Sequence, residues 1–183
     1  MNTERSLSNE ETRVKERALR GEIVLISPQG LKALDVQIEA VRQEVDVKTL
    51  ELGLVAQQDT DLPENLGFKE TKTHIQTTLA VKLHTLREMK AKSIPYWTKH
   101  ENLVDFGTIF DAEVSVGDYI DSNRYILLGP AESLYVDMSK IGLTVLSYLS
   151  PLGRAVWGQP NVDGQETTYN APDGSATCRI HKI

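Results

Sequence analysis

The sequence has no long hydrophobic run and only one cysteine. No stretch of roughly 18 or more apolar residues is present, which excludes a membrane-spanning helix, and the N-terminal stretch MNTERSLSNEETRVKERALRG lacks the apolar core of a signal peptide. Cys178 alone cannot form an internal disulfide. These absences predict a cytoplasmic protein that makes no contact with a membrane.

Classical catalytic motifs are also missing. The sequence contains no GxSxG, no P-loop, no GxGxxG and no CxxC. Its 4 histidines are not at ligand spacing, since His74 and His84 would lie about 15 Å apart along a helix, too far to share a metal. The sequence therefore offers no catalytic or metal-binding site that a classical motif would identify.

Acidic residues outnumber basic ones by 26 to 20, which gives a formal net charge of -6. Sequence-independent binding of nucleic acid depends on Lys and Arg side chains that neutralise phosphates, so this balance disfavours an independent nucleic-acid-binding protein. The acidity is concentrated in the C-terminal half of the chain. Any contact with nucleic acid should therefore involve a local basic patch.

A first long helix is predicted to begin after Ser27. The Ser27 hydroxyl can cap free amides at a helix start, and Pro28 suits the first helical position. From there to about Gln57, residues recur at the heptad spacing that is typical of a coiled-coil seam. Its two series, apolar except for the lysine, are Leu31, Ile38, Val45 and Leu52, and Leu34, Val41, Lys48 and Val55.

A second helical pattern is predicted from residue 64 to about Ser93, before Pro95. Two long helices joined by a short turn most simply run antiparallel, each covering the apolar stripe of the other. The sequence thus predicts a helical hairpin, roughly 45 Å long at 1.5 Å per residue. The residues expected on the inner face of the second helix are Phe68, Ile75, Leu79, Leu83, Leu86 and Met89.

The two predicted helices differ in charge. Acids prevail between residues 28 and 57, and bases prevail between residues 64 and 93. The charges could pair across the hairpin, where each exposed pair contributes at most about 1 kcal/mol. Alternatively, a basic stripe that includes Lys69, Lys72 and Lys82 could face an anionic partner. The sequence alone leaves both interpretations open.

The C-terminal half has a different periodicity. Apolar and polar residues alternate from Val104 to Val116, which is typical of a strand. RYILLG and LTVLSY predict further strands, SPLGRAVWGQ predicts one short helix capped by Ser150, and NAPDGS predicts a hairpin turn. The fold class is therefore α+β, with an N-terminal polar arm at residues 1–21, a coiled-coil hairpin at 22–95 and a small antiparallel sheet domain with one short helix at 96–183.

The stretch DTDLPENLGF between the predicted helices concentrates negative charge. Asp61 as N-cap and Glu64 three residues later would form a capping box that opens the second helix. Asp59 adds a third acid, and like charges clustered at an exposed tip are unfavourable unless a cation meets them. Mg²⁺ suits such a site because it binds one or two carboxylates and keeps waters and substrate phosphates as its other ligands.

These features resemble the Gre-type bacterial transcript cleavage factors, the GreA and GreB family. The similarity covers roughly residues 22–183 and leaves the N-terminal arm outside. It depends on SPQGLKALDVQIEAV at the first helix, DLPEN at the tip, FGT and YILLG in early strands, SPLGRAVWG at the short helix and APDG near the end. The resemblance implies that the sheet domain has an FKBP-like fold.

The resemblance also implies a function. Family members insert the hairpin into the secondary channel of RNA polymerase, where tip acids help hold a second Mg²⁺ beside backtracked RNA; Asp61 and Glu64 would be those acids, supported by Asp59 and Asn65. Lys69, Lys72 and Lys82 would contact the 3′ segment of the nascent RNA. Ser150, Pro151 and Arg154 would contact the polymerase, and the protein would act as a monomer. Val156 and Trp157 are expected in the core.

Two residues of the predicted turn differ from the family pattern, and they leave three alternative functions. Thr60 stands where the family has glycine, and Pro63 stands where a polar or basic residue is common, so both stiffen the turn. A displaced tip could occupy the channel without supporting cleavage, because catalytic geometry tolerates little misplacement. The alternatives are a transcript cleavage factor, a non-cleaving channel regulator, and a prolyl isomerase or chaperone, for which the sheet domain has few aromatic residues.

Overall fold

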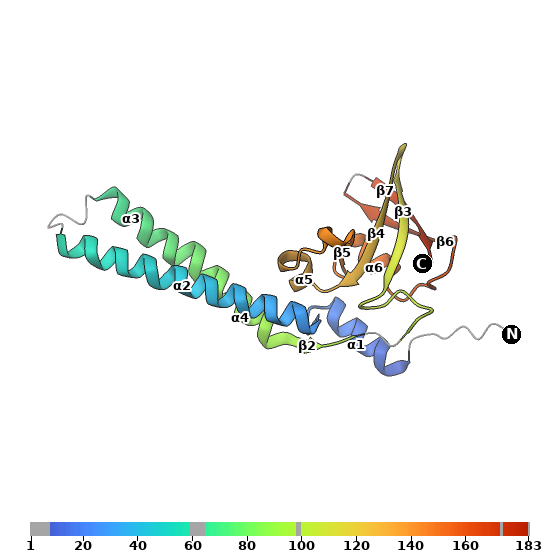
Figure 1. The fold of residues 1–183 in the computed structure, drawn as a ribbon, viewed down its shortest axis with the longest axis horizontal. Helices are drawn as coiled ribbons and strands as arrows, with labels where there is room; N and C mark the ends of the chain where they lie inside the picture. The colour runs from blue at the N-terminus through green and yellow to red at the C-terminus, as the bar shows by residue number, and fades with distance from the viewer. Residues whose placement is uncertain (1–7, 59–64, 98–99, 173, 183) are drawn as a thin grey trace. The chain divides into compact units, whose positions relative to one another are not determined.

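The computed structural model describes residues 8–58, 65–97, 100–172 and 174–182 (Figure 1). The chain divides into two compact units. The helical unit comprises Leu34–Ala91, and the sheet unit comprises the described parts of Met1–Ala33 and Lys92–Ile183. This division differs from the predicted boundaries at residues 21 and 95, since residues 8–33 belong to the sheet unit.

Two helical segments lie antiparallel in the helical unit (Figure 1). The first is α2 (Pro28–Gln58), and the second consists of α3 (Leu66–Thr73), a π-helix (His74–Leu79) and α4 (Ala80–Lys92). Lys90 Nζ lies 2.6 Å from Asp35 Oδ1, and His74 Nε2 lies 4.0 Å from Glu44 Oε1. Residue numbers rise along one segment as they fall along the other, which sets the antiparallel direction.

The apolar faces of both segments are those predicted from the sequence. All eight heptad positions of α2 are buried or half-buried, and Leu34 and Val41 are buried. On the second segment, Leu79 and Leu86 are buried, and Phe68 is half-buried. Burial at heptad spacing shows that one face of each helix packs inward while the rest meets solvent.

The π-helix was not predicted, and the spacing of apolar residues accounts for it. Ile75, Leu79 and Leu83 follow one another at intervals of four, where a heptad would alternate three and four. An α-helix turns too far to keep such residues on one side, and a π-helix has a wider turn that absorbs the extra residue. The inserted turn therefore keeps the inner face of the second segment directed at α2.

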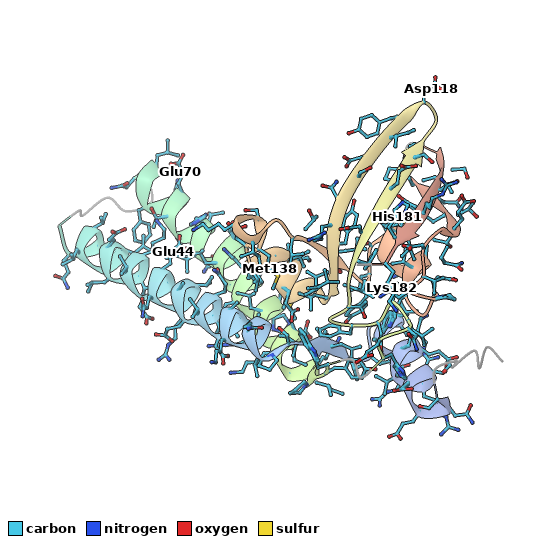
Figure 2. All side chains as sticks on the ribbon, turned by 45° about the vertical axis from the view of Figure 1, so that its right-hand side comes forward. Glu44, Glu70, Asp118, Met138, His181 and Lys182 are labelled. Atoms are coloured by element: carbon cyan, nitrogen blue, oxygen red, sulfur yellow. The ribbon has the colours of Figure 1, made fainter. Side chains whose placement is uncertain are left out.

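The main sheet of the sheet unit has five strands in the order β5-β4-β3-β7-β6. β3 pairs antiparallel with β4 and β7, and β6 pairs antiparallel with β7, whereas β4 and β5 are parallel. Asp118 lies at the turn of the β3–β4 hairpin (Figure 2). The strands are β3 (Ile109–Val116), β4 (Tyr119–Leu128), β5 (Thr144–Ser147), β6 (Gln165–Ala171) and β7 (Gly174–His181).

The sheet is mixed, which corrects the prediction of a purely antiparallel sheet with one short helix. Between β4 and β5 lie α5 (Pro130–Tyr135) and a 3₁₀ turn (Ser139–Ile141). Parallel neighbours need a crossover connection, which these elements provide. α6 (Pro151–Val156) is the short helix that the sequence did predict. The predicted strand from Val104 begins only at Ile109, because residues 104–108 form a buried loop.

The start of α2 is fixed by one local hydrogen bond and by one from a distant part of the chain. Ser27 Oγ accepts a hydrogen bond from the Gly30 amide at 2.9 Å, as its predicted capping role requires. The Ser27 amide itself donates to Oε1 of Glu132, a fully buried residue of α5, at 2.5 Å. The carboxylate thus lies at the positive end of a 31-residue helix, where negative charge is favourable.

Residues 9–19 form a helix, α1 (Asn9–Leu19), that packs on the sheet unit. Ala18 is buried in the same core cluster as Phe106 and Phe110. The helix begins with a capping box between Ser8 and Glu11. The sequence predicted a polar arm for this segment, and its described residues form a capped helix.

Two short strands join the ends of the helical segments within the sheet unit. β1 (Val24–Ile26) pairs in parallel with β2 (Ser93–Pro95), so the chain enters α2 and leaves α4 at neighbouring positions. Of the described residues, none belongs to a helix that is both long and apolar enough to cross a bilayer.

Candidate functional site

The predicted acidic site lies between the ends of the two helical segments. α2 ends at Gln58, and α3 begins at Leu66. Asp61 and Glu64, the predicted catalytic and metal-binding acids, and Asp59, predicted to support the tip, fall outside the described residues. The structure therefore fixes the two helix ends that carry this connection and leaves the roles of the three acids as predictions.

The N-cap of α3 is Asn65, which corrects the prediction that Asp61 caps this helix. Asn65 Oδ1 accepts a hydrogen bond from the Phe68 amide at 3.0 Å. A cap at Asp61 would require Leu62 to be helical, and a residue that precedes proline disfavours helical backbone. Asn65, predicted to support the tip, thus has a direct structural role, and Glu64 precedes the helix.

A cavity of about 270 Å³ lies between the helix ends next to the acidic connection. Leu52 and Val55 of α2 and Phe68 of α3 provide its apolar wall, and Glu51 adds a carboxylate. Gly67 lies in the first turn of α3 and also lines the cavity. The described ends of α2 and α3 therefore leave a partly apolar cavity between them.

The three lysines predicted to contact RNA are exposed, but they do not form one stripe. Lys69 and Lys72 each follow an inward-facing residue by one position, whereas Lys82 precedes the half-buried Leu83 by one. One residue is a rotation of about 100° in an α-helix, so Lys82 points to the opposite side. Lys69 and Lys72 share one side of α3 and lie close to the connection in sequence.

Pairing across the helical unit uses other residues than these lysines. Lys90 contacts Asp35, and His74 lies near Glu44. Glu44 lies on α2 and Glu70 on α3, as Figure 2 shows. No carboxylate in the described part of the chain lies within 4.0 Å of the three lysine ammonium groups. Cross-helix pairing therefore involves Lys90 and His74. Contact of the three lysines with an anionic partner stays a prediction.

The predicted polymerase-contacting residues lie around α6. Ser150 Oγ accepts a hydrogen bond from the Gly153 amide at 3.0 Å and donates to the Ser147 carbonyl at 2.7 Å, so it caps the helix. Pro151 and Arg154 are exposed. Val156 and Trp157 are buried in the core, as predicted. The exposed pair is therefore the part of this motif that a partner could reach.

A buried polar cluster near α6 was missed at the sequence level. Asp105 is 1% exposed, and its Oδ1 accepts hydrogen bonds from the Phe106 amide and from Trp157 Nε1, at 2.8 and 2.7 Å. Lys15 of α1 donates to the Trp157 carbonyl and lies over the Trp157 ring. Burial lowers the pKa of Lys15, and the Asp105 carboxylate opposes that shift. The cluster attaches α1 to the sheet unit.

A second cavity, of about 480 Å³, lies on the sheet beside the 3₁₀ turn. Arg124 contacts both carboxylate oxygens of Asp111, at 2.7 and 3.0 Å, and the guanidinium lowers the pKa of Asp111. His181, at the end of β7 (Figure 2), and Ile141 complete this wall. Because Arg124 and Asp111 are paired with each other, neither presents an unpaired charge to the cavity.

Metal ligands do not converge within the part of the chain that the structure describes. No group of three or more His, Cys, Asp or Glu side chains there could hold a metal ion. His84 lies 3.7 Å from Glu88, and His100 lies 2.8 Å from Glu11. Each of these two histidines thus has a carboxylate neighbour.

Comparison with known proteins found similarity in solved structures alone. No family model and no curated protein matches the chain. The similar solved structures include Thermus aquaticus Gfh1, at 17% identity and a TM-score of 0.40 over 87% of this chain and 97% of that one. GreA factor homolog 1 (Gfh1) of Thermus thermophilus is 18% identical, with a TM-score of 0.38 over 88% and 98% of the two chains.

A third similar structure is that of the transcription elongation factor GreA/GreB from Nitrosomonas europaea. It is 17% identical, with a TM-score of 0.31 over 87% of this chain and 97% of that one. The structural neighbours are thus Gre-type transcription factors, the family that the sequence resembles, at low sequence identity.

Proposed function

We propose that this protein is a transcription factor that enters the secondary channel of bacterial RNA polymerase and stimulates cleavage of backtracked RNA by the polymerase. The single observation that supports it most strongly is the placement of the acidic connection. Asp59, Asp61 and Glu64 lie in sequence between the ends of two antiparallel helices. At 1.5 Å per residue, the 31 residues of α2 span about 46 Å, enough to carry those acids to a buried centre.

Asp61 and Glu64 would share a Mg²⁺ ion with the polymerase. Two-metal hydrolysis uses one ion at the attacking oxygen and another at the leaving oxygen of a phosphodiester. Carboxylates from this chain can supply one or two ligands of such an ion, while phosphates and waters supply the rest. The protein therefore completes a transient metal site and is not an enzyme by itself.

Other residues would position the RNA and the factor. Lys69 and Lys72 lie on one side of α3, close in sequence to the acidic connection, and their ammonium groups can contact phosphates near the RNA 3′ end. Lys82 would contribute from the other side of the second segment. Pro151 and Arg154, the exposed pair at α6, would contact the polymerase surface.

The second candidate function is that of a non-cleaving channel regulator. Thr60 and Pro63 beside the acids favour it, since both restrict the backbone of the connection. The Asn65 cap also fixes the start of α3 after Glu64, so this acid precedes the helix that follows. A tip held about 1 Å from the productive position would lose roughly a hundredfold in rate and would occupy the channel without cleavage.

The length of RNA in a backtracked elongation complex separates these functions. Purified protein that stimulates cleavage will shorten the 3′-labelled RNA, and Asp61→Asn or Glu64→Gln will abolish the shortening. Slowed extension at constant RNA length would instead identify the regulator. If neither RNA length nor extension changes, both polymerase functions are wrong, and a prolyl isomerase assay tests the remaining alternative.

A further inference from the structure

α2 carries a second apolar series that faces solvent. Its members alternate at intervals of four and three, the spacing of a coiled-coil seam. All six are exposed, and Leu50 and Val36 are 67% and 65% exposed. We call this series the outer seam; it consists of five apolar residues, Val36, Ala40, Val47, Leu50 and Leu54, and of the polar Gln43.

The outer seam lies on the side of α2 away from its packed face. Positions of the two heptad series are separated by roughly 150° around the helix axis. The inner series, which includes Leu34 and Val41, packs inward. α2 therefore has one apolar face that is covered by the second segment and another that no described residue covers.

Acidic residues flank the outer seam. The positions immediately beside it hold Glu39, Glu44, Asp46 and Glu51, together with the uncharged Gln37 and Gly53. No lysine or arginine occupies these positions. Two of the acids have neighbours within the chain, Arg42 at 4.0 Å from Glu39 and His74 at 4.0 Å from Glu44, whereas no such neighbour lies beside Asp46 or Glu51 among the described residues. Flanking charges of coiled-coil seams select the partner helix by charge complementarity. A matching helix would carry lysine or arginine beside its own apolar seam.

A second copy of this chain fits the outer seam poorly. Two outer seams packed together would bring acid against acid, which is unfavourable. The basic α3–α4 segment of a second copy exposes only two large apolar residues among its described residues, Leu66 and Val81, and these are not at heptad spacing. The observed pattern therefore favours a different protein.

We propose that the outer seam of α2 is a docking site for a basic amphipathic helix of another protein. Contiguous exposed apolar residues commonly mark such sites, and helices bind through apolar anchors spaced by three and four. From Val36 to Leu54 the seam is about 27 Å long, room for two to three heptads of a partner. The inference goes beyond the proposed function, because it uses neither the acidic connection nor any polymerase contact.

Fluorescence anisotropy with a designed peptide tests this proposal on the full chain. The probe is a labelled helix of three heptads with Leu at the seam positions and Lys at the flanking ones, and the control peptide has Glu at the flanking positions. The lysine peptide will bind, and the glutamate peptide will not. The double variant Val47→Gln with Leu50→Gln will weaken binding at least about tenfold, a loss of roughly 1.4 kcal/mol.

Val81→Gln provides the matched control, because Val81 is an equally exposed valine on α4. It will leave peptide binding unchanged, and circular dichroism will show that both variants keep the wild-type helicity. Equal binding of the two peptides, or unchanged binding in the double variant, overturns the proposal. A wild-type dimer in sedimentation that the double variant abolishes would also overturn it, since the occupant would then be a second copy.

Discussion

The sheet unit and the helical unit are stabilised in different ways. The sheet unit encloses a broad core in which Phe106, Phe110 and Tyr148 are fully or almost fully buried. It also buries Asp105 and Glu132, each with hydrogen-bonded partners from distant positions in the chain. Among its described residues, the helical unit fully buries only Leu34, Val41, Leu79 and Leu86.

This difference relates structure to the proposed roles. A core that encloses large aromatic rings and hydrogen-bonded carboxylate oxygens specifies one arrangement of strands and suits a domain that presents a fixed surface. A narrow seam leaves most of each helix exposed, so α2 and the second segment keep both charged and apolar faces for other molecules. In the proposed function, the sheet unit would bind the polymerase surface and the helical unit would extend into the channel.

Truncation of a core side chain gives the largest expected effect. Phe110→Ala should destabilise the protein by about 3–5 kcal/mol, because it removes a fully buried ring from the sheet core. Leu86→Ala in the helical unit should cost less, toward the lower end of about 2–5 kcal/mol, since solvent can relax around a narrow seam. Urea unfolding measures both. Equal losses would show that the seam is packed as tightly as the core.

The buried Cys178 thiol reports on the sheet unit alone. Burial raises the pKa of Cys178 from 9.0 to about 11, so the folded protein holds roughly a hundredfold less thiolate. The stability that this shift gives is complete below pH 9 and is lost as the pH rises toward 11. Alkylation at pH 8 should be slow in the native protein and should accelerate in Phe110→Ala.

Leu86→Ala is the matched variant for the Cys178 measurement. If the helical unit opens by itself, this variant will leave the alkylation rate unchanged. Acceleration of alkylation equal to that in Phe110→Ala would show that the two units unfold as one.

Two glycines of the same helix should respond oppositely to alanine. At Gly30, an added Cβ would lie 2.3 Å from Glu132 Oε1, so Gly30→Ala should destabilise by about 1–3 kcal/mol. At Gly53 nothing lies within 4 Å, and Gly53→Ala should stabilise by about 0.5–1 kcal/mol through helix propensity. Thermal unfolding measures both. Tolerance of Gly30→Ala would mean that Glu132 does not closely support the start of α2.

The smallest expected effect concerns the attachment of α1. The Ser8 amide, with further help from the Ser8 hydroxyl and from His100, lowers the pKa of Glu11. The ionised Glu11 carboxylate therefore stabilises the fold above pH 4.5, and this contribution is lost as the pH falls below that value. Glu11→Gln should lower Tm by about 2 °C at pH 7 and by less at pH 4. The control is Glu10→Gln, whose Tm difference should not shrink with pH in the same way.

Sequence periodicity predicted the helical unit well because its contacts repeat along the chain. Every position of the two heptad series of α2 is buried or half-buried, and Ser27 and Ser150 cap the helices as predicted. Short-range chemistry decides such features. The cap of α3 was misassigned because Asp61 and Asn65 are both good capping residues, and the capping-box spacing favoured the wrong one.

Long-range contacts explain what the sequence did not reveal. Glu132 contacts Ser27, 105 positions away, and Asp105 contacts Trp157, 52 positions away, so no local pattern marks either carboxylate as buried. The parallel pairing of β5 likewise depends on the crossover through α5. The acids of the candidate site were predicted from local composition, and their chemistry remains a prediction.

Crosslinking from the acidic connection tests the central claim most directly. A photoreactive residue at Leu62, between Asp61 and Glu64, would be activated in a complex with a backtracked polymerase whose RNA 3′ end is labelled. We expect a crosslink to the RNA 3′ segment or to the polymerase active centre, and no such crosslink from the same residue placed at Leu134, an exposed position of the sheet unit. Crosslinks from Leu62 confined to the outer surface of the polymerase would contradict insertion of the helices into the channel.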